Sequence, residues 1–134
     1  MTKMATIVLD EFIDQPPVRV WAALTRPELI ARWWAPGNVS AEPGHRFTLD
    51  MGKWGQQPCE VVASDPERMI SYTFSKWMTI TWRIQAEGEG TRLTLEHSGF
   101  DLDTPLGRQA YDGMGAGWPA ILKRISGALQ AQAV

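Results

Sequence analysis

The sequence contains little cysteine, no long apolar run and no excess of positive charge. Its single cysteine, Cys59, cannot form an internal disulfide bond, which fits a reducing compartment. The apolar run at residues 7–9 is too short for a secretory signal, and no run approaches the length of a membrane span. We therefore expect a cytoplasmic protein without a membrane partner.

The charge of the chain is nearly balanced. Its 13 basic and 15 acidic residues are scattered along the sequence and give a net charge of −2. No basic stripe is available to neutralise phosphate groups, so we do not expect nucleic acid as a partner. Two histidines and one cysteine without paired spacing give no metal signature. We therefore expect no metal and no cofactor.

Catalytic motifs are equally scarce. Cys59 has no basic neighbour in the sequence to lower its pKa, so we expect a small buried apolar residue rather than a nucleophile. His45 follows a Pro-Gly pair, which places it in a solvated turn. The spacing of the residues indicates neither a Ser-His-acid triad nor a catalytic pair of carboxylates. The sequence gives an enzymatic function no support, although it leaves such a function open.

Tryptophan, by contrast, is abundant. The chain has seven tryptophans in 134 residues, and three of them lie in residues 20–36, where Trp33 and Trp34 are adjacent. Tryptophan is seldom fully buried without a partner for its indole N–H. The sequence therefore indicates either a core packed with large rings or a cavity lined by them.

The N-terminal third predicts one strand and two short helices. Residues 6–13 are β-branched and apolar enough for a strand. Pro17 suits the first turn of a helix, and residues recur at helical spacing from Val18 to Thr25. Thr25 and Glu28 have the spacing of a capping box, which predicts a second helix with Thr25 as its N-cap.

After residue 44 the apolar period changes from 3.6 to 2. Alternating runs cover residues 46–51, 70–75, 78–85 and 92–97, and the run at 59–63 belongs to the same meander. Such alternation indicates an antiparallel sheet with one covered face. The register predicts that Arg83 points to solvent and that the covered, concave face carries Tyr72, Phe74, Ile80, Trp82, Leu93 and Leu95.

The C-terminal segment supplies a helix to cover that face. An apolar stripe from Trp118 to Leu129 recurs at helical spacing. Three glycines between residues 113 and 117 lower helix propensity, and Pro119 has no N–H to donate. We therefore predict a break or kink between Gly113 and Pro119, with the long helix starting near Pro119. The pattern as a whole predicts one α+β domain over residues 1–134.

Five motifs follow one another along the chain: Val20-Trp21 with Leu24-Thr25, Trp33-Trp34-Ala35-Pro36, Asp65-Pro66-Glu67-Arg68, the run Gly-Thr-Arg-Leu-Thr-Leu at 90–95, and Gly117-Trp118. Together they resemble the SRPBCC superfamily, which includes START domains and the birch-pollen allergen. Within it, the chain is similar to the family of the activator of Hsp90 ATPase homologue 1-like proteins. The resemblance implies a helix-grip fold, in which a curved antiparallel sheet wraps around a long C-terminal helix. It also implies a cavity between sheet and helix, closed at one end by the two short helices.

These observations together favour a protein that binds a small hydrophobic molecule. His97 lies on the same face of its predicted strand as Leu93 and Leu95, so we expect its side chain to point inward. It could serve there as a polar contact for a ligand or as an ordinary core histidine. The expected looseness between Gly113 and Pro119 would let Met114 and Trp118 act as a gate. The residues predicted to contact the ligand are Trp34, Phe47, Tyr72, Phe74, Ile80, Trp82, His97, Met114 and Trp118.

Two other functions are consistent with the same sequence. A co-chaperone-like interaction module would need an exposed apolar patch rather than a deep pocket. A cyclase- or hydratase-like enzyme would need an acid or second base beside His97 or the substrate. The sequence also leaves a homodimer open.

Overall fold

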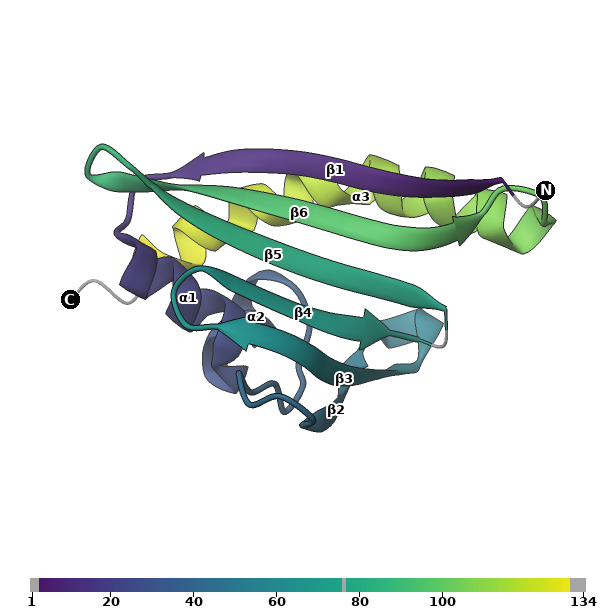
Figure 1. Ribbon diagram of the computed structural model, residues 1–134, viewed down its shortest axis with the longest axis horizontal. Helices are drawn as coiled ribbons and strands as arrows, with labels where there is room; N and C mark the ends of the chain where they lie inside the picture. The colour runs from purple at the N-terminus through teal and green to yellow at the C-terminus, as the bar shows by residue number, and fades with distance from the viewer. Residues whose placement is uncertain (1–2, 76, 131–134) are drawn as a thin grey trace.

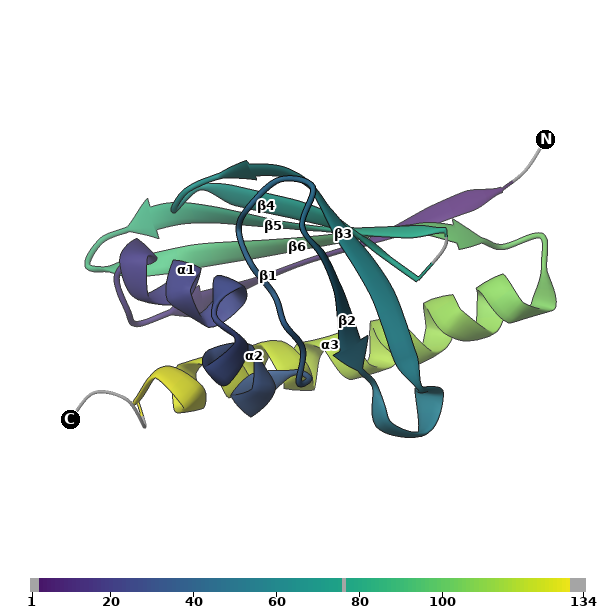
Figure 2. The ribbon, with the colours of Figure 1, turned by 90° about the horizontal axis from the view of Figure 1, so that it is seen from below.

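A six-stranded antiparallel sheet arches over one long helix (Figures 1 and 2). The computed structural model describes residues 3–75 and 77–130. The elements in chain order are β1 (Met4–Ile13), α1 (Pro17–Thr25), α2 (Pro27–Trp33), β2 (Arg46–Asp50), the 3-10 turn η1 (Gly52–Trp54), β3 (Gln56–Asp65), β4 (Met69–Phe74), β5 (Met78–Glu87), β6 (Gly90–Asp101) and α3 (Pro105–Gln130). The predicted α+β architecture, with two short helices after the first strand, is confirmed.

The sheet has the order β1-β6-β5-β4-β3-β2, so the first strand pairs with the last. Two irregularities interrupt the pairing, one between Val61 and Ala63 on β3 and one where Gly99 of β6 has no partner on β1. Gly99 has a φ of +101°, a conformation that residues with a side chain rarely adopt. An extra residue of this kind bends and twists a strand, which contributes to the arch of the sheet.

The concave face of the sheet carries the residues that the alternation predicts. Tyr72, Phe74, Ile80, Trp82, Leu93 and Leu95 are all buried. Arg83 lies on the opposite face, where its guanidinium donates to Glu96 at 3.0 Å and its side chain is 57% exposed. The predicted register is therefore confirmed across β4, β5 and β6.

The two short helices are present, but the predicted capping box is wrong. Helix α1 ends at Thr25, and Arg26 is the N-cap of α2 without a side-chain capping bond. The Thr25 hydroxyl donates to the carbonyl of Trp21 at 2.8 Å, one turn back in α1. Pro27 at the first position of α2 fixes the start of that helix without a capping side chain. The spacing to Glu28 therefore has no structural role at this junction.

The predicted break between Gly113 and Pro119 is also wrong. Helix α3 runs from Pro105 to Gln130 with Pro119 in its interior. Pro119 is exposed, whereas Trp118, Leu122 and Ile125 are buried on the face toward the sheet. The burial of this face outweighs the low intrinsic propensity of the glycines and of Pro119, since tertiary packing supplies most helix stability in proteins.

The short helices close the end of the arch near the C-terminus of α3 (Figure 2). Helix α2 lies against α3, and α1 also contacts it. The Arg19 guanidinium of α1 donates to the carbonyl of Leu129 in the last turn of α3 at 2.8 Å. This bond satisfies one of the carbonyls that a helix end leaves without an internal partner. The helices thus position Trp33 and Trp34 beside the buried face of α3.

Candidate ligand-binding site

Ten rings meet in the space between the sheet, α2 and α3, and we refer to them as the aromatic cluster. Neighbouring ring centroids lie 4.7–6.3 Å apart, and most pairs are edge-on or tilted. Such arrangements are the favourable ones for aromatic side chains. The members are Trp33, Trp34, Phe47, Tyr72, Phe74, Trp82, His97, Phe100, Tyr111 and Trp118.

The buried tryptophans of the aromatic cluster each have a partner for the indole N–H. Trp33 donates to the carbonyl of Ala23 at 2.9 Å, and Trp82 donates to the Tyr72 hydroxyl at 2.8 Å. Trp118 donates to Nδ1 of His97 at 3.0 Å. These bonds hold the three indoles in fixed orientations, because a buried donor left without an acceptor costs about 1–3 kcal/mol.

Trp34 differs from the other tryptophans of the aromatic cluster. It is partly exposed, and no described residue accepts a hydrogen bond from its indole N–H. Its ring nevertheless lies 5.1 Å from Trp118 and 5.8 Å from Phe74, between the sheet and α3. Trp34 therefore covers the buried rings from the solvent side and has fewer polar contacts holding it there.

His97 is the main polar group inside the aromatic cluster. Its side chain is fully buried, and its ring is surrounded by Phe74, Phe100 and Trp118. Burial lowers the pKa of His97 to about 4, so the imidazole is neutral near pH 7. Because the Trp118 N–H can only donate, Nδ1 must be the acceptor and Nε2 carries the proton. The N–H at Nε2 has no hydrogen-bond partner among the described residues.

The other polar groups around the aromatic cluster are poorly suited to proton transfer. Burial raises the pKa of Tyr72 far above its ordinary value, so the phenol stays protonated. Burial also raises the pKa of Cys59 to about 12, which keeps this thiol protonated. The expectation that Cys59 is a small buried residue is thus confirmed.

His45 lies just after the turn that precedes β2. Its Nε2 lies 2.6 Å from the carbonyl oxygen of Asn38, and its ring stacks on Phe47 at 5.8 Å. It remains half-buried at the edge of the sheet and is not part of the aromatic cluster. His45 thus follows the turn and remains partly solvated, as predicted, while Phe47 covers one face of its ring.

Most of the residues predicted to contact a ligand come together in the structure. Phe47, Tyr72, Phe74, Ile80, Trp82, His97 and Trp118 are buried, while Trp34 and Met114 are half-buried. Their role in binding a ligand stays a prediction. The proposed gate of Met114 and Trp118 loses its basis, because α3 is continuous and Trp118 is bonded to His97.

The residues predicted from the sequence do not include three members of the aromatic cluster, Trp33, Phe100 and Tyr111. Trp33 stacks on Trp34 and meets Trp82 edge-on, and its position next to Trp34 in the sequence was the available signal. Phe100 lies 4.7 Å from His97 because Gly99 shifts the alternation of β6 by one residue. A glycine at the end of an alternating run is a signal for such a bulge.

The cavity that the resemblance implies is not apparent at these residues, because aromatic rings occupy its place. Two depressions of the described surface lie beside the aromatic cluster. One, of about 600 Å³, is open to solvent and touches Phe47 and Cys59, and the other, of about 270 Å³, touches Tyr111. Neither is lined by His97, Trp82 or Trp118.

Two kinds of feature are absent from residues 3–75 and 77–130. No helix in this part of the chain is long and apolar enough to cross a bilayer. Within the same residues, no three His, Cys, Asp or Glu side chains are grouped so that they could hold a metal ion.

Solved structures of other proteins have the same fold. Protein MLL2253 from Mesorhizobium loti is 31% identical, with a TM-score of 0.87 over 97% of this chain and 100% of that one. Protein BH1534 from Bacillus halodurans is 26% identical, with a TM-score of 0.87 over 96% and 99% of the two chains. CalU16 from Micromonospora echinospora is 22% identical, with a TM-score of 0.75 over 96% and 85%, and shares the fold.

Comparison with protein families gives a more specific result. Among curated proteins, none matches this sequence. The family model described as "Activator of Hsp90 ATPase homolog 1-like protein" matches residues 14–130, which include both short helices, strands β2 to β6 and α3. This chain therefore belongs to the family of activator of Hsp90 ATPase homologue 1-like proteins.

Proposed function

We propose that this protein binds a small hydrophobic molecule at the aromatic cluster, between the sheet and α3. The observation that carries the proposal is the unpartnered N–H at Nε2 of His97. A buried donor without an acceptor destabilises the empty protein by about 1–3 kcal/mol. A ligand that offers an acceptor to Nε2 would remove this cost, so the site favours the bound state.

The surroundings of His97 define the chemical class of this ligand. The neighbouring rings of Phe74, Phe100 and Trp118 favour a flat, apolar body. His97 is neutral, so the polar group that it binds is a neutral acceptor such as a ketone oxygen rather than a carboxylate that requires a cation. The proposed ligand is therefore an aromatic or polycyclic molecule with one carbonyl-type oxygen.

The packed rings must separate to admit such a molecule, and Trp34 is the ring best placed to move. It ends α2 with a backbone conformation outside the helical region (φ −130°, ψ −79°). Its indole N–H is free of protein partners in the described chain, whereas those of Trp33, Trp82 and Trp118 are bonded. We therefore expect the ligand to displace the Trp34 ring and to contact Trp82 and Trp118 below it.

The alternative functions have less support. No described acid or second base is hydrogen-bonded to His97, which the cyclase- or hydratase-like alternative would need. The co-chaperone alternative requires a contiguous exposed apolar patch. The exposed rings of Trp54 and Trp77 lie on separate turns, and the exposed apolar residues of β1 are separated from one another by Thr6 and Asp10. We therefore propose ligand binding and no reaction.

A pair of matched ligands tests the proposal. Calorimetric titration with 1-acetonaphthone and with 1-ethylnaphthalene compares two molecules of similar shape, of which only the first has a carbonyl oxygen. We expect the wild-type protein to bind the ketone about tenfold more tightly, corresponding to one buried hydrogen bond. The variant His97→Leu should bind both molecules equally well.

The other histidine provides the control. The variant His45→Leu removes an imidazole that touches the aromatic cluster only through Phe47, at its edge, and should keep the preference for the ketone. The proposal fails if neither molecule binds to the wild-type protein, or if His97→Leu retains the preference. Native mass spectrometry of the purified protein would independently reveal a co-purified ligand, and its mass would identify the molecule.

A further inference from the structure

Strand β1 forms a free edge of the sheet. It lies at the end of the strand order, and Figure 1 shows no strand beyond it. Its ten residues contain no proline, and the nearby bulge belongs to Gly99 of β6 rather than to β1. Charges, prolines and bulges are the usual protection of an edge strand against pairing with another chain. Over its central residues β1 carries only Asp10 and Glu11 as such protection.

The opposite edge of the sheet is shorter and partly covered. Strand β2 has five residues, and Gly37 forms an isolated bridge with Leu49. The backbone N–H of Asp50 donates to the carbonyl of Pro36 at 2.8 Å. The segment that follows α2 thus uses hydrogen-bonding groups of β2, whereas no described segment does so for the outer side of β1.

The outer face of β1 carries three exposed apolar residues. Met4 is 55% exposed, Val8 62% and Phe12 42%. They are spaced four residues apart and alternate with Thr6 and Asp10 on the same face, which gives a pattern that is symmetric about Val8. In an antiparallel pair of two copies centred on Val8, this pattern places apolar residues opposite apolar residues and polar residues opposite polar ones.

We propose that two copies of this chain associate through antiparallel pairing of their β1 strands, with the twofold axis at Val8. In this register the apolar residues of the outer face meet one another, with Val8 opposite Val8 of the partner copy. The remaining pairs are Met4 with Phe12, Thr6 with Asp10, Ala5 with Glu11 and Ile7 with Leu9. Centring the axis at Ile7 or Leu9 would instead place Val8 opposite Thr6 or Asp10.

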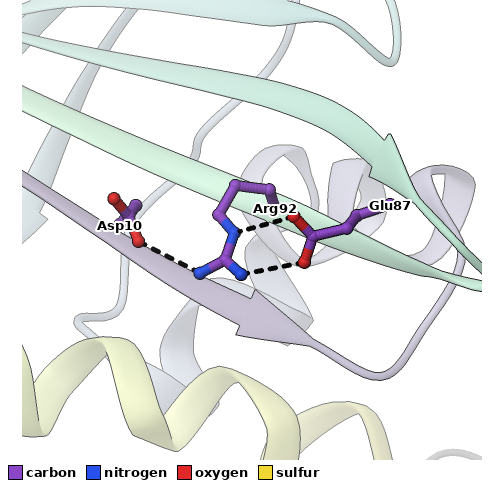
Figure 3. A network of polar contacts seen from close by, with 3 residues as sticks. All are labelled: Asp10, Glu87 and Arg92. Atoms are coloured by element: carbon purple, nitrogen blue, oxygen red, sulfur yellow. Dashed lines mark hydrogen bonds and ion pairs between the residues drawn. The ribbon is translucent and has the colours of Figure 1, made fainter.

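Charges do not oppose this register. Each acidic residue of β1 faces an uncharged residue of the other copy, since Asp10 faces Thr6 and Glu11 faces Ala5. Figure 3 shows that Arg92 lies between Asp10 and Glu87, with N–O distances of 3.1 and 2.8 Å. Arg92 also lies 5.7 Å from the ring centre of Phe12. The charge of Asp10 is therefore partly offset within its own copy by Arg92, which it shares with Glu87. Pairing would continue the sheet through both copies.

Engineered cysteines test both the dimer and its register. The variant Val8→Cys places two thiols directly opposite each other and should form a disulfide-linked dimer under mild oxidation. Thr6→Cys is the matched control, because two copies of residue 6 would lie about 13 Å apart along paired strands and should not cross-link. A mixture of Thr6→Cys and Asp10→Cys should yield the mixed disulfide. The buried Cys59, whose pKa is raised to about 12, should not compete.

Light scattering tests the association without a cross-link. The wild-type protein should become dimeric as its concentration rises, and Val8→Lys should stay monomeric because two lysines would meet on the axis. Val62→Lys is the control, since Val62 is a similarly exposed valine on β3 and should leave the dimer intact. A wild-type monomer at all concentrations, or Thr6→Cys cross-linking as readily as Val8→Cys, would overturn the proposal.

Discussion

The indole N–H of Trp118 donates a hydrogen bond of 3.0 Å to Nδ1 of His97, and both side chains are buried. This bond joins α3 to β6 inside an otherwise aromatic and aliphatic core. It also determines which nitrogen of the imidazole carries the proton, and so which atom faces the rest of the aromatic cluster without a partner.

The stability of the protein should depend on the protonation of His97. Unfolded His97 takes up a proton near its ordinary pKa of 6.5, whereas folded His97 does so only near pH 4. The unfolded state therefore binds more protons between these values, so the free energy of unfolding should fall by up to about 3 kcal/mol as the pH drops from 6.5 to 4. Above pH 6.5 this contribution is fully present.

Urea unfolding of the wild type and of His97→Gln at several pH values measures this effect. Glutamine can accept the Trp118 bond through its amide oxygen but does not titrate. The titration of carboxylates affects both proteins alike. The difference between their free energies of unfolding at each pH therefore reports the protonation of His97. If the free energies of unfolding of the two proteins changed in parallel between pH 7 and pH 4.5, the pKa of His97 would be the same in the folded and unfolded states, against the prediction.

Removing the Trp118 indole nitrogen should destabilise the protein by about 1–3 kcal/mol, because Nδ1 of His97 then lacks a donor. Trp118→Phe is the variant, and Trp54→Phe, at an exposed tryptophan, should change stability by less than about 0.5 kcal/mol. In a His97→Leu background the same Trp118→Phe change should cost less, since no acceptor remains. An additive double-mutant cycle would contradict the coupling of the two residues.

The large buried rings of the aromatic cluster should contribute strongly to the stability of the protein. Trp82 is fully buried and bonded to Tyr72, so Trp82→Ala should lower the free energy of unfolding by about 3–5 kcal/mol. Trp77→Ala removes an equally large ring that is mostly exposed and should have little effect. Guanidinium unfolding of both variants makes the comparison. Equal losses would mean that the rings around Trp82 are loosely packed.

Two glycine-to-alanine substitutions should have opposite effects on thermal stability. At Gly99, an added Cβ would lie 2.2 Å from the carbonyl oxygen of Trp77, and φ is +101°, so Gly99→Ala should strongly destabilise the sheet. At Gly113 in α3 an added Cβ meets nothing within 4 Å, so Gly113→Ala should stabilise the helix by about 1 kcal/mol. A lower melting temperature for Gly113→Ala would show that this position has a role beyond the helix.

The sequence predicted the sheet well because its signal is local and repeated. Alternation in β4, β5 and β6 assigns each side chain to one face, and a single error would have placed Arg83 in the core. Alternation of the same kind placed Phe47, Tyr72, Phe74 and Trp82 in the predicted site, whereas Trp34 and Trp118 lie on helical segments. Phe100 could not be found this way, because the unpaired Gly99 reverses the alternation at the end of β6.

The helices were harder to predict because their ends depend on tertiary contacts. Propensity alone predicts a break near Pro119, but the buried side chains that flank it hold α3 against the sheet. The Thr25 hydroxyl bonds to the carbonyl of Trp21 instead of capping α2. The spacing between Thr25 and Glu28 could not distinguish these two hydrogen bonds. The unpartnered Nε2 of His97 also depends on long-range packing, since Trp118 reaches Nδ1 from another element.

The pairing of β1 with β6 has a consequence for how the chain is made. Ile7 pairs with His97, about 90 residues later in the sequence. The ribosome therefore releases β1 long before its partner, while β2 to β6 can pair successively as neighbouring hairpins. A nascent chain that stalls before β6 emerges holds an apolar strand with nothing to pair with, so synthesis must pass residue 101 before the sheet can be completed.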